Sequence, residues 1–287
     1  HLNDVPTASQ RRNHLTALWE SILHHEPPLI EALAKDLGKP REEVHFQEIY
    51  PLKAEIHHAR RHLRGWMAPR PASTPLAMVG TRAYVEANPK GHVLIISPWN
   101  FPFILTLRPL VSALAAGNRV IVKPSEHTPE TSKVLADVVR HAVPEMVATV
   151  VQGGPEVSAH LTALPFQHIC FTGGTAIGKK VMRAAAENLA SLTLELGGKS
   201  PAVVDSTVNL VDASKRMAWG KCLNNGQVCI APDYALVEER IAQPFLDALK
   251  ARFVDMYGAD DHAQLHNGQR SHMVNDHHFN RVVKLIQ

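Results

Sequence analysis

Three polar residues in this sequence have the side chains that covalent chemistry on a carbonyl group requires. Cys229 follows a glycine-containing turn in the stretch from Asn225 to Ala231, and Glu195 precedes two glycines 34 residues upstream. Asn100 follows an apolar run that ends at Pro98. A thiol can attack a carbonyl carbon, a carboxylate can act as a base, and an amide can donate to the oxyanion that forms.

Each of these residues also has a structural interpretation. Cys229 is either a thiolate nucleophile, with a pKa lowered by a turn that leads into a helix, or a small buried hydrophobe. Glu195 ends an apolar strand, where partial desolvation raises the pKa of a general base; it could equally cap a strand or form an ion pair. Asn100 could be a simple turn residue before Phe101 and Pro102.

The other two cysteines are expected to have structural roles only. Cys170 lies inside an apolar strand and is expected in the core, and Cys222 lies on a predicted helix and is expected to be structural. Three cysteines without a short pairing argue against a disulfide framework and fit a reducing, cytoplasmic location. His58 and His62 have the helical spacing of two metal ligands, but no third ligand follows, so no metal site is expected.

Composition excludes several classes of protein. The 287 residues are 45% hydrophobic and 20% charged, which is ordinary for a globular protein with a substantial core. The net charge of +3 is too small and too evenly spread to indicate nucleic acid or an anionic membrane as a partner. No apolar run reaches the ~18 residues of a membrane span, so no membrane segment is expected.

Apolar patterning predicts helices from about residue 9 to 64, a linker at 65–75 and an exposed strand at 82–87. Short buried strands then alternate with helices, which predicts an α/β fold with a Rossmann-like parallel sheet. The strands are expected at 92–97, 119–122, 148–151 and 168–171. One helix is expected to close at Gly117, and the next to be capped by Thr128 with Pro129 at its first position.

The sequence predicts a change of domain near Leu196. Residues 1–195 would hold the N-terminal helices and the dinucleotide-binding domain. Residues 196–287 would be the start of an α/β catalytic domain, with a strand at 201–204 and a helix at about 211–223.

Glycines between the strand at 168–171 and a helix expected at 179–189 indicate a phosphate site. They let a ligand approach the backbone, and a helix start favours anions, although the spacing is not the dinucleotide fingerprint. Lys123 and Glu126 end a neighbouring strand, where they could hold ribose hydroxyls or form a surface ion pair.

These motifs, in this order and spacing, resemble the aldehyde dehydrogenase superfamily over nearly the whole chain. The phrase from Gly226 to Tyr234 resembles the class 3 branch, which includes coniferyl-aldehyde, fatty-aldehyde and aromatic-aldehyde dehydrogenases. The motifs that carry the resemblance are Pro98-Trp99-Asn100, Lys123-Pro124-Ser125-Glu126, Phe171-Thr172-Gly173, Glu195-Leu196-Gly197-Gly198-Lys199 and Gly226-Gln227-Val228-Cys229.

The resemblance implies a role for each matching residue. Cys229 would attack the aldehyde, Asn100 would hold the oxyanion, and Glu195 would activate water to release the carboxylic acid. The cofactor would be NAD, with NADP possible, because Glu126 would repel a ribose 2′-phosphate. The residues expected around it are Trp99, Lys123, Ser125, Glu126, Gly154, Phe171, Thr172, Gly173, Gly178, Leu196 and Gly197.

The resemblance also implies a cytoplasmic homodimer at full length and an aromatic, coniferyl-aldehyde-like or medium-chain aliphatic substrate. Family members continue well beyond the equivalent of Gln287, so we expect a fragment that is poorly stable and inactive by itself. The strand within 82–90 would belong to a bridging, oligomerisation pair that lacks its partners. Two alternatives stay open: an acylating dehydrogenase, and a non-catalytic binding or structural protein that retains the fold.

Overall fold

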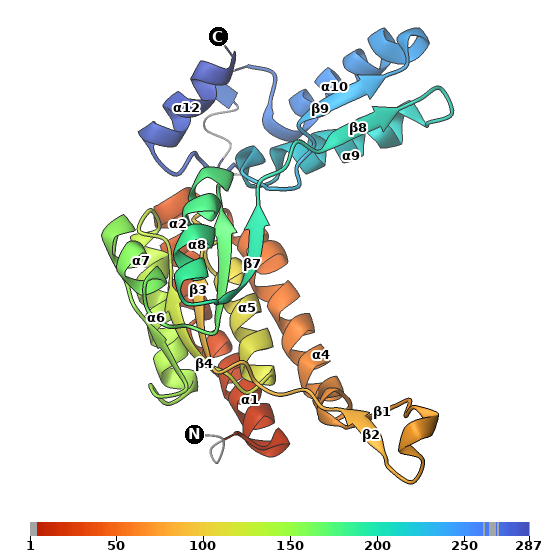
Figure 1. Ribbon diagram of the computed structural model, residues 1–287. Coiled ribbons are helices and arrows are strands. Elements are labelled where there is room, and N and C mark those ends of the chain that lie inside the picture. The colour runs from red at the N-terminus through yellow and green to blue at the C-terminus, as the bar shows by residue number, and fades with distance from the viewer. Residues whose placement is uncertain (1–4, 261, 264–267, 269, 287) are drawn as a thin grey trace.

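The computed structural model describes residues 5–260, 262–263, 268 and 270–286. Figure 1 shows a central body of helices around a sheet, a two-stranded arm at one end, and a helix–strand unit that projects at the other. Among the described residues, no helix has both the length and the apolar character needed to cross a membrane.

The centre of the molecule is a five-stranded sheet in which every neighbouring pair is parallel. Its order is β5-β4-β3-β6-β7, so the chain builds outward from β3 in one direction and then from β6 in the other. The reversal places a topological switch point between β3 and β6, where open parallel sheets bind ligands. The predicted α/β class is confirmed. The strands are β3 (His92–Ile96), β4 (Arg119–Lys123), β5 (Ala148–Val150), β6 (His168–Gly173) and β7 (Ser191–Leu196).

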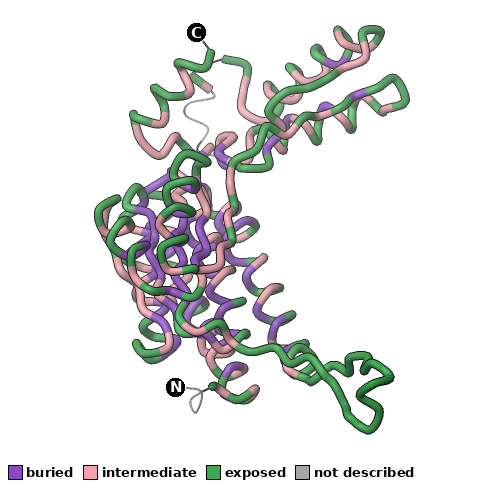
Figure 2. The backbone as a smooth tube through the Cα atoms, viewed as in Figure 1, coloured by how far each residue is buried: buried purple, intermediate pink, exposed green. Residues whose placement is uncertain are grey.

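Helices lie on both faces of this sheet. Successive side chains of a strand point to opposite faces, and here both sets are largely apolar, so both faces need covering. In β3, Val93 and Ile95 belong to the larger core cluster and Leu94 and Ile96 to the smaller one. Figure 2 shows the buried residues gathered in this body. Helices α5 (Ile104–Ala115) and α6 (Pro129–Ala142) contribute to the larger cluster, and α7 (Pro155–Thr162) and α8 (Thr175–Glu187) to the smaller one.

The N-terminal helices pack against α5 and α6, so the predicted helical segment is confirmed. A π-helical segment, Val44–Ile49, lies between the third and the fourth of these helices, and its first and last residues are buried. The helices are α1 (Ala8–His24), α2 (Glu26–Leu37), α3 (Arg41–Glu43) and α4 (Tyr50–Met67).

The predicted linker at 65–75 is wrong in two respects. Helix α4 continues to Met67, and Arg70–Ala72 form a strand, β1, that pairs antiparallel with β2 (Ala83–Val85). The expected strand at 82–87 therefore has a partner within the chain. The sequence did not indicate this partner because β1 is only three residues long and contains Pro71, which a sheet tolerates at its edge. Both strands are exposed along their whole length.

Two helix starts also differ from expectation. Thr128 occupies the N-cap position of α6, but its side chain makes no capping hydrogen bond. The carboxylate of Asp36, from α2, instead accepts from the backbone N–H groups of Glu130 (3.2 Å) and Thr131 (2.7 Å). Helix α8 begins at Thr175, four residues before the predicted start, because Gly178 packs closely on β7 and does not interrupt the helix.

After β7 the chain leaves the main sheet. β8 (Pro201–Val204) pairs in parallel with β9 (Tyr234–Val237) as a separate two-stranded sheet. Helix α9 (Leu210–Cys222) connects them and packs on α10 (Ala242–Tyr257). The helix predicted at the end of the chain is present as α12 (Asp276–Ile286), and Gln287 lies outside the described residues. A domain boundary near Leu196 remains our proposal.

Candidate functional site

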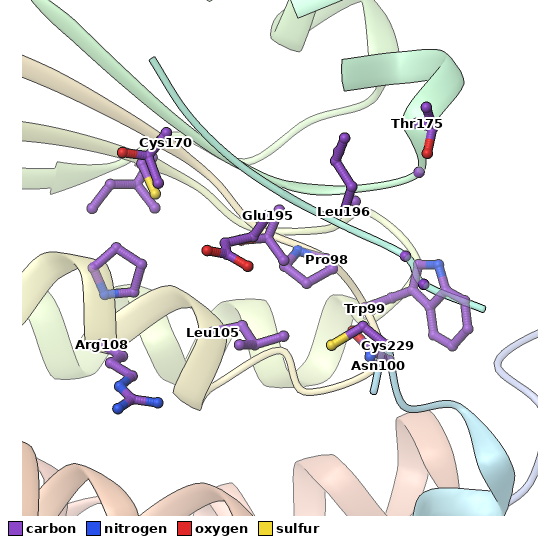
Figure 3. A pocket seen from close by; sticks show the side chains of 18 of the residues that line it. Pro98, Trp99, Asn100, Leu105, Arg108, Cys170, Thr175, Glu195, Leu196 and Cys229 are labelled. Atoms are coloured by element: carbon purple, nitrogen blue, oxygen red, sulfur yellow. The ribbon is translucent and has the colours of Figure 1, made fainter. Parts of the chain in front are cut away.

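The three residues singled out for carbonyl chemistry line one cavity of ≈ 1380 Å³. It runs along one face of β3, β6 and β7, from His168 at the start of β6 to Pro98, Gly173 and Leu196 at the strand ends, and it therefore includes the switch point of the sheet. Figure 3 shows Glu195 projecting into this space from β7, with the Cys229 sulfur pointing into it from the opposite side, near Asn100. The fold thus brings together side chains that are 34 to 129 residues apart in the sequence.

Cys229 is presented by a tight turn. Asn224, Asn225 and Gly226 adopt left-handed backbone conformations in succession, with φ of 49°, 53° and 75°. Such conformations are tolerated by Gly and Asn and by few other residues, which explains the Asn-Asn-Gly sequence. Cys229 is exposed. The expected helix after the cysteine is wrong, because a turn and then β9 follow it.

The Asn100 amide is held against the cysteine loop. Its Nδ2 donates to the backbone carbonyl of Gln227 at 2.9 Å, and the backbone carbonyl of Asn100 accepts from Asn224 Nδ2 at 2.7 Å. An amide nitrogen carries two protons, so one N–H of Asn100 is left for an oxyanion in the cavity. Asn224 and Gln227 are both buried and stabilise the same loop.

A buried ion pair supports the Asn100 segment from behind. Lys39 and Glu48 have fully buried side chains, and Lys39 Nζ donates to Glu48 Oε1 at 2.6 Å. The ammonium also reaches the Asn100 carbonyl at 3.4 Å and lies over the Phe101 ring, 4.4 Å from its centroid. The second Glu48 oxygen accepts from the backbone N–H of Ile104 at 2.8 Å, which caps the start of α5. The pair therefore fixes both ends of the segment that carries Asn100.

Glu195 differs from expectation in its environment. It lies on β7, the edge strand of the sheet, and it is exposed, so the predicted partial desolvation is wrong for this chain. It faces the cavity beside buried Cys170, which is in the core as predicted. Burial, and secondarily the nearby Glu195 charge, raise the pKa of Cys170 to about 11. Cys170 is therefore a poor nucleophile at neutral pH.

The Glu195 and Cys229 segments approach each other closely. A Cβ added to Gly198 would lie 3.3 Å from the Cys229 carbonyl oxygen. Just beyond, the Asp233 N–H donates to the Ser200 carbonyl at 2.9 Å, and Lys199 pairs with Asp233. The two glycine-rich motifs are thus joined next to the cavity.

Five of the predicted cofactor residues line the same cavity as Cys229: Trp99, Thr172, Gly173, Leu196 and Gly197. The N-terminus of the 13-residue helix α8 also faces it through Gly174, Thr175 and Ala176. This helix has no side-chain cap and no acidic residue in its first turn. The arrangement fits a dinucleotide pyrophosphate, because backbone N–H groups and the helix dipole attract anions.

Lys123, Ser125 and Glu126 lie at the end of β4, outside the lining of that cavity. Lys123 Nζ donates to Glu126 Oε2 at 2.7 Å, so the ion pair considered from the sequence is formed. Partial burial by itself raises the pKa of Glu126. The hydrogen bond and charge of Lys123, together with a backbone N–H, outweigh it and bring the pKa below its ordinary value. Glu126 is therefore anionic at neutral pH. Ser125 is buried and accepts from the His127 N–H.

The remaining predicted cofactor residues have packing or capping roles. Phe171 and Gly178 are buried between β6, β7 and α8, and a Cβ on Gly178 would come within 2.9 Å of Leu196 Cδ2. Gly154 precedes α7, and its N–H donates to Glu156 Oε1 at 3.1 Å. None of the three lines the cavity.

Helix α12 contributes a residue that the sequence did not indicate. Its His278 packs on Trp99, with ring centroids 4.6 Å apart, and lines the cavity with Arg281. Burial, with nearby positive charge, lowers the pKa of His278. Of the aromatic residues in this segment, Phe103 is fully buried in the core, whereas Trp99 lines the cavity.

The chain is similar to known proteins along its length. Residues 4–287 match the model of the aldehyde dehydrogenase family. AldX of Bacillus subtilis, described as a putative aldehyde dehydrogenase, is 43% identical over 280 residues, which are 98% of this chain and 62% of that protein. A probable coniferyl aldehyde dehydrogenase of Pseudomonas aeruginosa is 44% identical over 86% of this chain and 52% of its own length.

The fold is also similar to solved structures. The substrate-bound state of Staphylococcus aureus AldH superposes with a TM-score of 0.93 at 38% identity, covering 99% of this chain and 62% of that one. The chain thus spans about three fifths of the length of such relatives.

Proposed function

The chain belongs to the aldehyde dehydrogenase family, and from that premise we propose that the full-length protein oxidises an aldehyde to its carboxylic acid with NAD(P)⁺. One observation carries this proposal: Cys229, Asn100 and Glu195 line a single cavity that reaches the carboxyl edge of the parallel sheet.

The proposed chemistry begins at Cys229. Its thiolate adds to the aldehyde carbon, and the C–S bond forms as the carbonyl π electrons move to oxygen. The free Asn100 N–H and the Cys229 backbone N–H hold the resulting oxyanion. When bound, the nicotinamide ring supplies a two-electron acceptor for the hydride that leaves the former aldehyde carbon. Loss of that hydride restores the carbonyl and leaves a thioester on Cys229.

Glu195 completes the proposed turnover. Its carboxylate removes a proton from water, the hydroxide adds to the thioester carbonyl, and the C–S bond breaks to release the acid and regenerate the thiolate. An exposed carboxylate on an edge strand can reach water readily. This assignment favours hydrolysis over transfer to another thiol, the step that an acylating dehydrogenase would use.

For the cofactor, we propose that the N-terminus of α8, with Thr172 and Gly173, binds the pyrophosphate, and that Lys123 and Glu126 bind the adenine ribose. The anionic Glu126 would repel a ribose 2′-phosphate, so NAD is favoured over NADP. A relative from dog carries the name "Aldehyde dehydrogenase, dimeric NADP-preferring", so NADP is kept as the second candidate. Four residues that do not line the cavity would hold the cofactor-binding segments in place: Ser125, Gly154, Phe171 and Gly178.

The substrate proposal is an aromatic, coniferyl-aldehyde-like or medium-chain aliphatic aldehyde. It is supported by the apolar Trp99 and Leu105 side chains in the cavity and by the similarity to the Pseudomonas protein. We also propose that the full-length protein is a homodimer. We place it in the cytoplasm, where its three free cysteines would stay reduced.

Replacing Glu195 by Gln tests the role of the base. The variant of the full-length protein is expected to give an initial burst of about one NADH per active site and then to turn over slowly, because the thioester forms but is not hydrolysed. Stopped-flow absorbance would measure burst and steady state together.

The control is Glu187→Gln, at the end of helix α8 and outside the cavity lining, which should leave both phases as they are. Steady-state turnover of Glu195→Gln equal to that of the unmodified protein would refute the assignment of Glu195 as the base.

A further inference from the structure

Three histidines meet on the surface where helices α1 and α6 end, and none of them lines the cavity. His24 is the last residue of α1, His25 follows it as the C-cap, and His141 lies in the last turn of α6. One ring nitrogen from each lies within 4.8 Å of those of the other two. Their ring centroids are 4.9, 5.2 and 5.6 Å apart, and each pair of rings is nearly perpendicular.

The orientation of His25 is fixed by a hydrogen bond of the kind that metal-binding histidines make. Its Nδ1 lies 2.8 Å from the Ser21 carbonyl oxygen. A carbonyl can only accept, so Nδ1 carries the proton and the lone pair of a neutral ring is on Nε2. Histidine ligands of metals almost always donate their other ring N–H in this way, which fixes the tautomer and raises the basicity of the ligand.

The scaffold beneath the three rings is rigid. Ser21 is buried, and its hydroxyl donates to the Val138 carbonyl of α6 at 2.8 Å. The residue that orients His25 is therefore anchored to the helix that carries His141, three residues further along. Helices α1 and α6 also pack against each other through the larger core cluster. The distance between the two ends of the cluster is consequently set by the core.

The charges around the cluster allow a cation. Helices α1 and α6 both end there and bring partial negative charge on their unsatisfied carbonyl groups, while α2 begins at His25 and partly offsets it with its positive N-terminus. The neighbouring Arg140 is paired with Asp137 at 2.8 Å, which offsets its positive charge. His24 and His141 are exposed and His25 is half-buried, so an ion and a bound water could reach the rings.

We propose that His24, His25 and His141 form a binding site for a divalent transition-metal ion of the Zn²⁺ class. Three imidazoles supply the ligands, and a fourth, solvent-facing position holds water. Imidazole prefers Zn²⁺, Cu²⁺ and Ni²⁺ to Mg²⁺ or Ca²⁺. This contradicts the expectation, drawn from sequence spacing, that the chain binds no metal. Sequence spacing could not reveal the site because its third ligand lies on another helix.

The geometry requires only side-chain movement. A tetrahedral ion with Zn–N distances of 2.0–2.1 Å places its ligand nitrogens about 3.3 Å apart. The three nitrogens, now within 4.8 Å, approach that spacing by rotation of the exposed His24 and His141 rings about their side-chain torsions. The bound ion would link the ends of α1 and α6 and so stabilise the N-terminal layer against the sheet domain.

The test is a calorimetric titration of the protein with Zn²⁺. Because cysteine thiolates are zinc ligands and Cys229 is exposed, every sample carries Cys229→Ala to remove that competing group. One Zn²⁺ per chain is expected, together with a rise in the thermal unfolding midpoint. His141→Ala should weaken binding by about 100-fold or more, since losing even an outer-shell partner typically costs 10–100-fold. It should also abolish the thermal shift.

The matched control is the double variant His58→Ala/His62→Ala. These two histidines lie one turn apart on α4, with ring centroids 4.2 Å apart, and no third ligand completes a cluster with them among the residues that the structure describes. Their removal should leave zinc binding unchanged. Failure to bind one equivalent of Zn²⁺, equal affinity in the His141→Ala variant, or loss of binding in the control would each overturn the proposal.

Discussion

Replacing Cys229 by alanine in the full-length protein is expected to lower kcat for aldehyde oxidation by about 10⁴-fold or more. Losses of this order follow removal of a catalytic nucleophile, because the covalent route is closed and only binding and oxyanion stabilisation remain. The chain offers no substitute thiol at the same place. Cys170 lines the same cavity, but burial and the nearby Glu195 raise its pKa to about 11. The measurement is aldehyde-dependent NADH formation, followed by absorbance at saturating cofactor.

The matched control is Cys222→Ala. Cys222 is a half-buried residue at the end of α9, with a pKa raised by burial, and it lies outside the cavity lining. Its replacement should leave kcat nearly unchanged. A Cys229→Ala variant that retains more than a few per cent of the activity, while folded by circular dichroism, would contradict the assignment of Cys229 as nucleophile.

Replacing Glu48 by alanine is expected to destabilise the protein by about 3–5 kcal/mol. The substitution leaves the Lys39 ammonium buried without its partner, and removing one member of a buried pair costs this much. It also removes the carboxylate that caps α5 at Ile104. Urea denaturation, followed by tryptophan fluorescence, would measure the loss, because Trp19 and Trp99 pack against the larger core cluster.

Two further variants make this test specific. Glu55→Ala removes the partner of Arg108, an exposed side chain 3.2 Å away, and should change stability by about 0–1 kcal/mol. Combining Glu48→Ala with Lys39→Met should restore part of the lost stability, because no uncompensated charge then remains. A Glu48→Ala variant as stable as Glu55→Ala would show that the pair does not support the Asn100 segment.

The sequence allowed the sheet to be predicted and three side chains suited to carbonyl chemistry to be selected, because both steps depend on local patterns. Apolar runs such as His92 to Ile96 are recognisable as buried strands wherever they occur. Cys229 and Asn100 follow a turn or a strand end, Glu195 is the penultimate residue of β7, and the parallel topology places such strand ends at one edge.

What could not be predicted depends on contacts between distant residues. Asp36 caps a helix that begins more than ninety residues later, and Lys39 and Glu48 look like surface charges in the sequence. The exposure of Glu195 follows from the position of β7 at the sheet edge, which only the assembled order of strands reveals. Likewise, β1 is recognisable only through its partner β2, because it contains a proline and all three of its residues are exposed.

The central claim is that the oxidised substrate becomes a thioester on Cys229, and mass spectrometry of a trapped intermediate tests it most directly. The Glu195→Gln form of the full-length protein would be mixed with aldehyde and NAD⁺, quenched in acid after the burst, digested and mapped. The account predicts one acyl group per active site, located on the peptide that contains Cys229. An acyl group on the Cys170 or Cys222 peptide instead, or none on any peptide despite NADH formation, would contradict it.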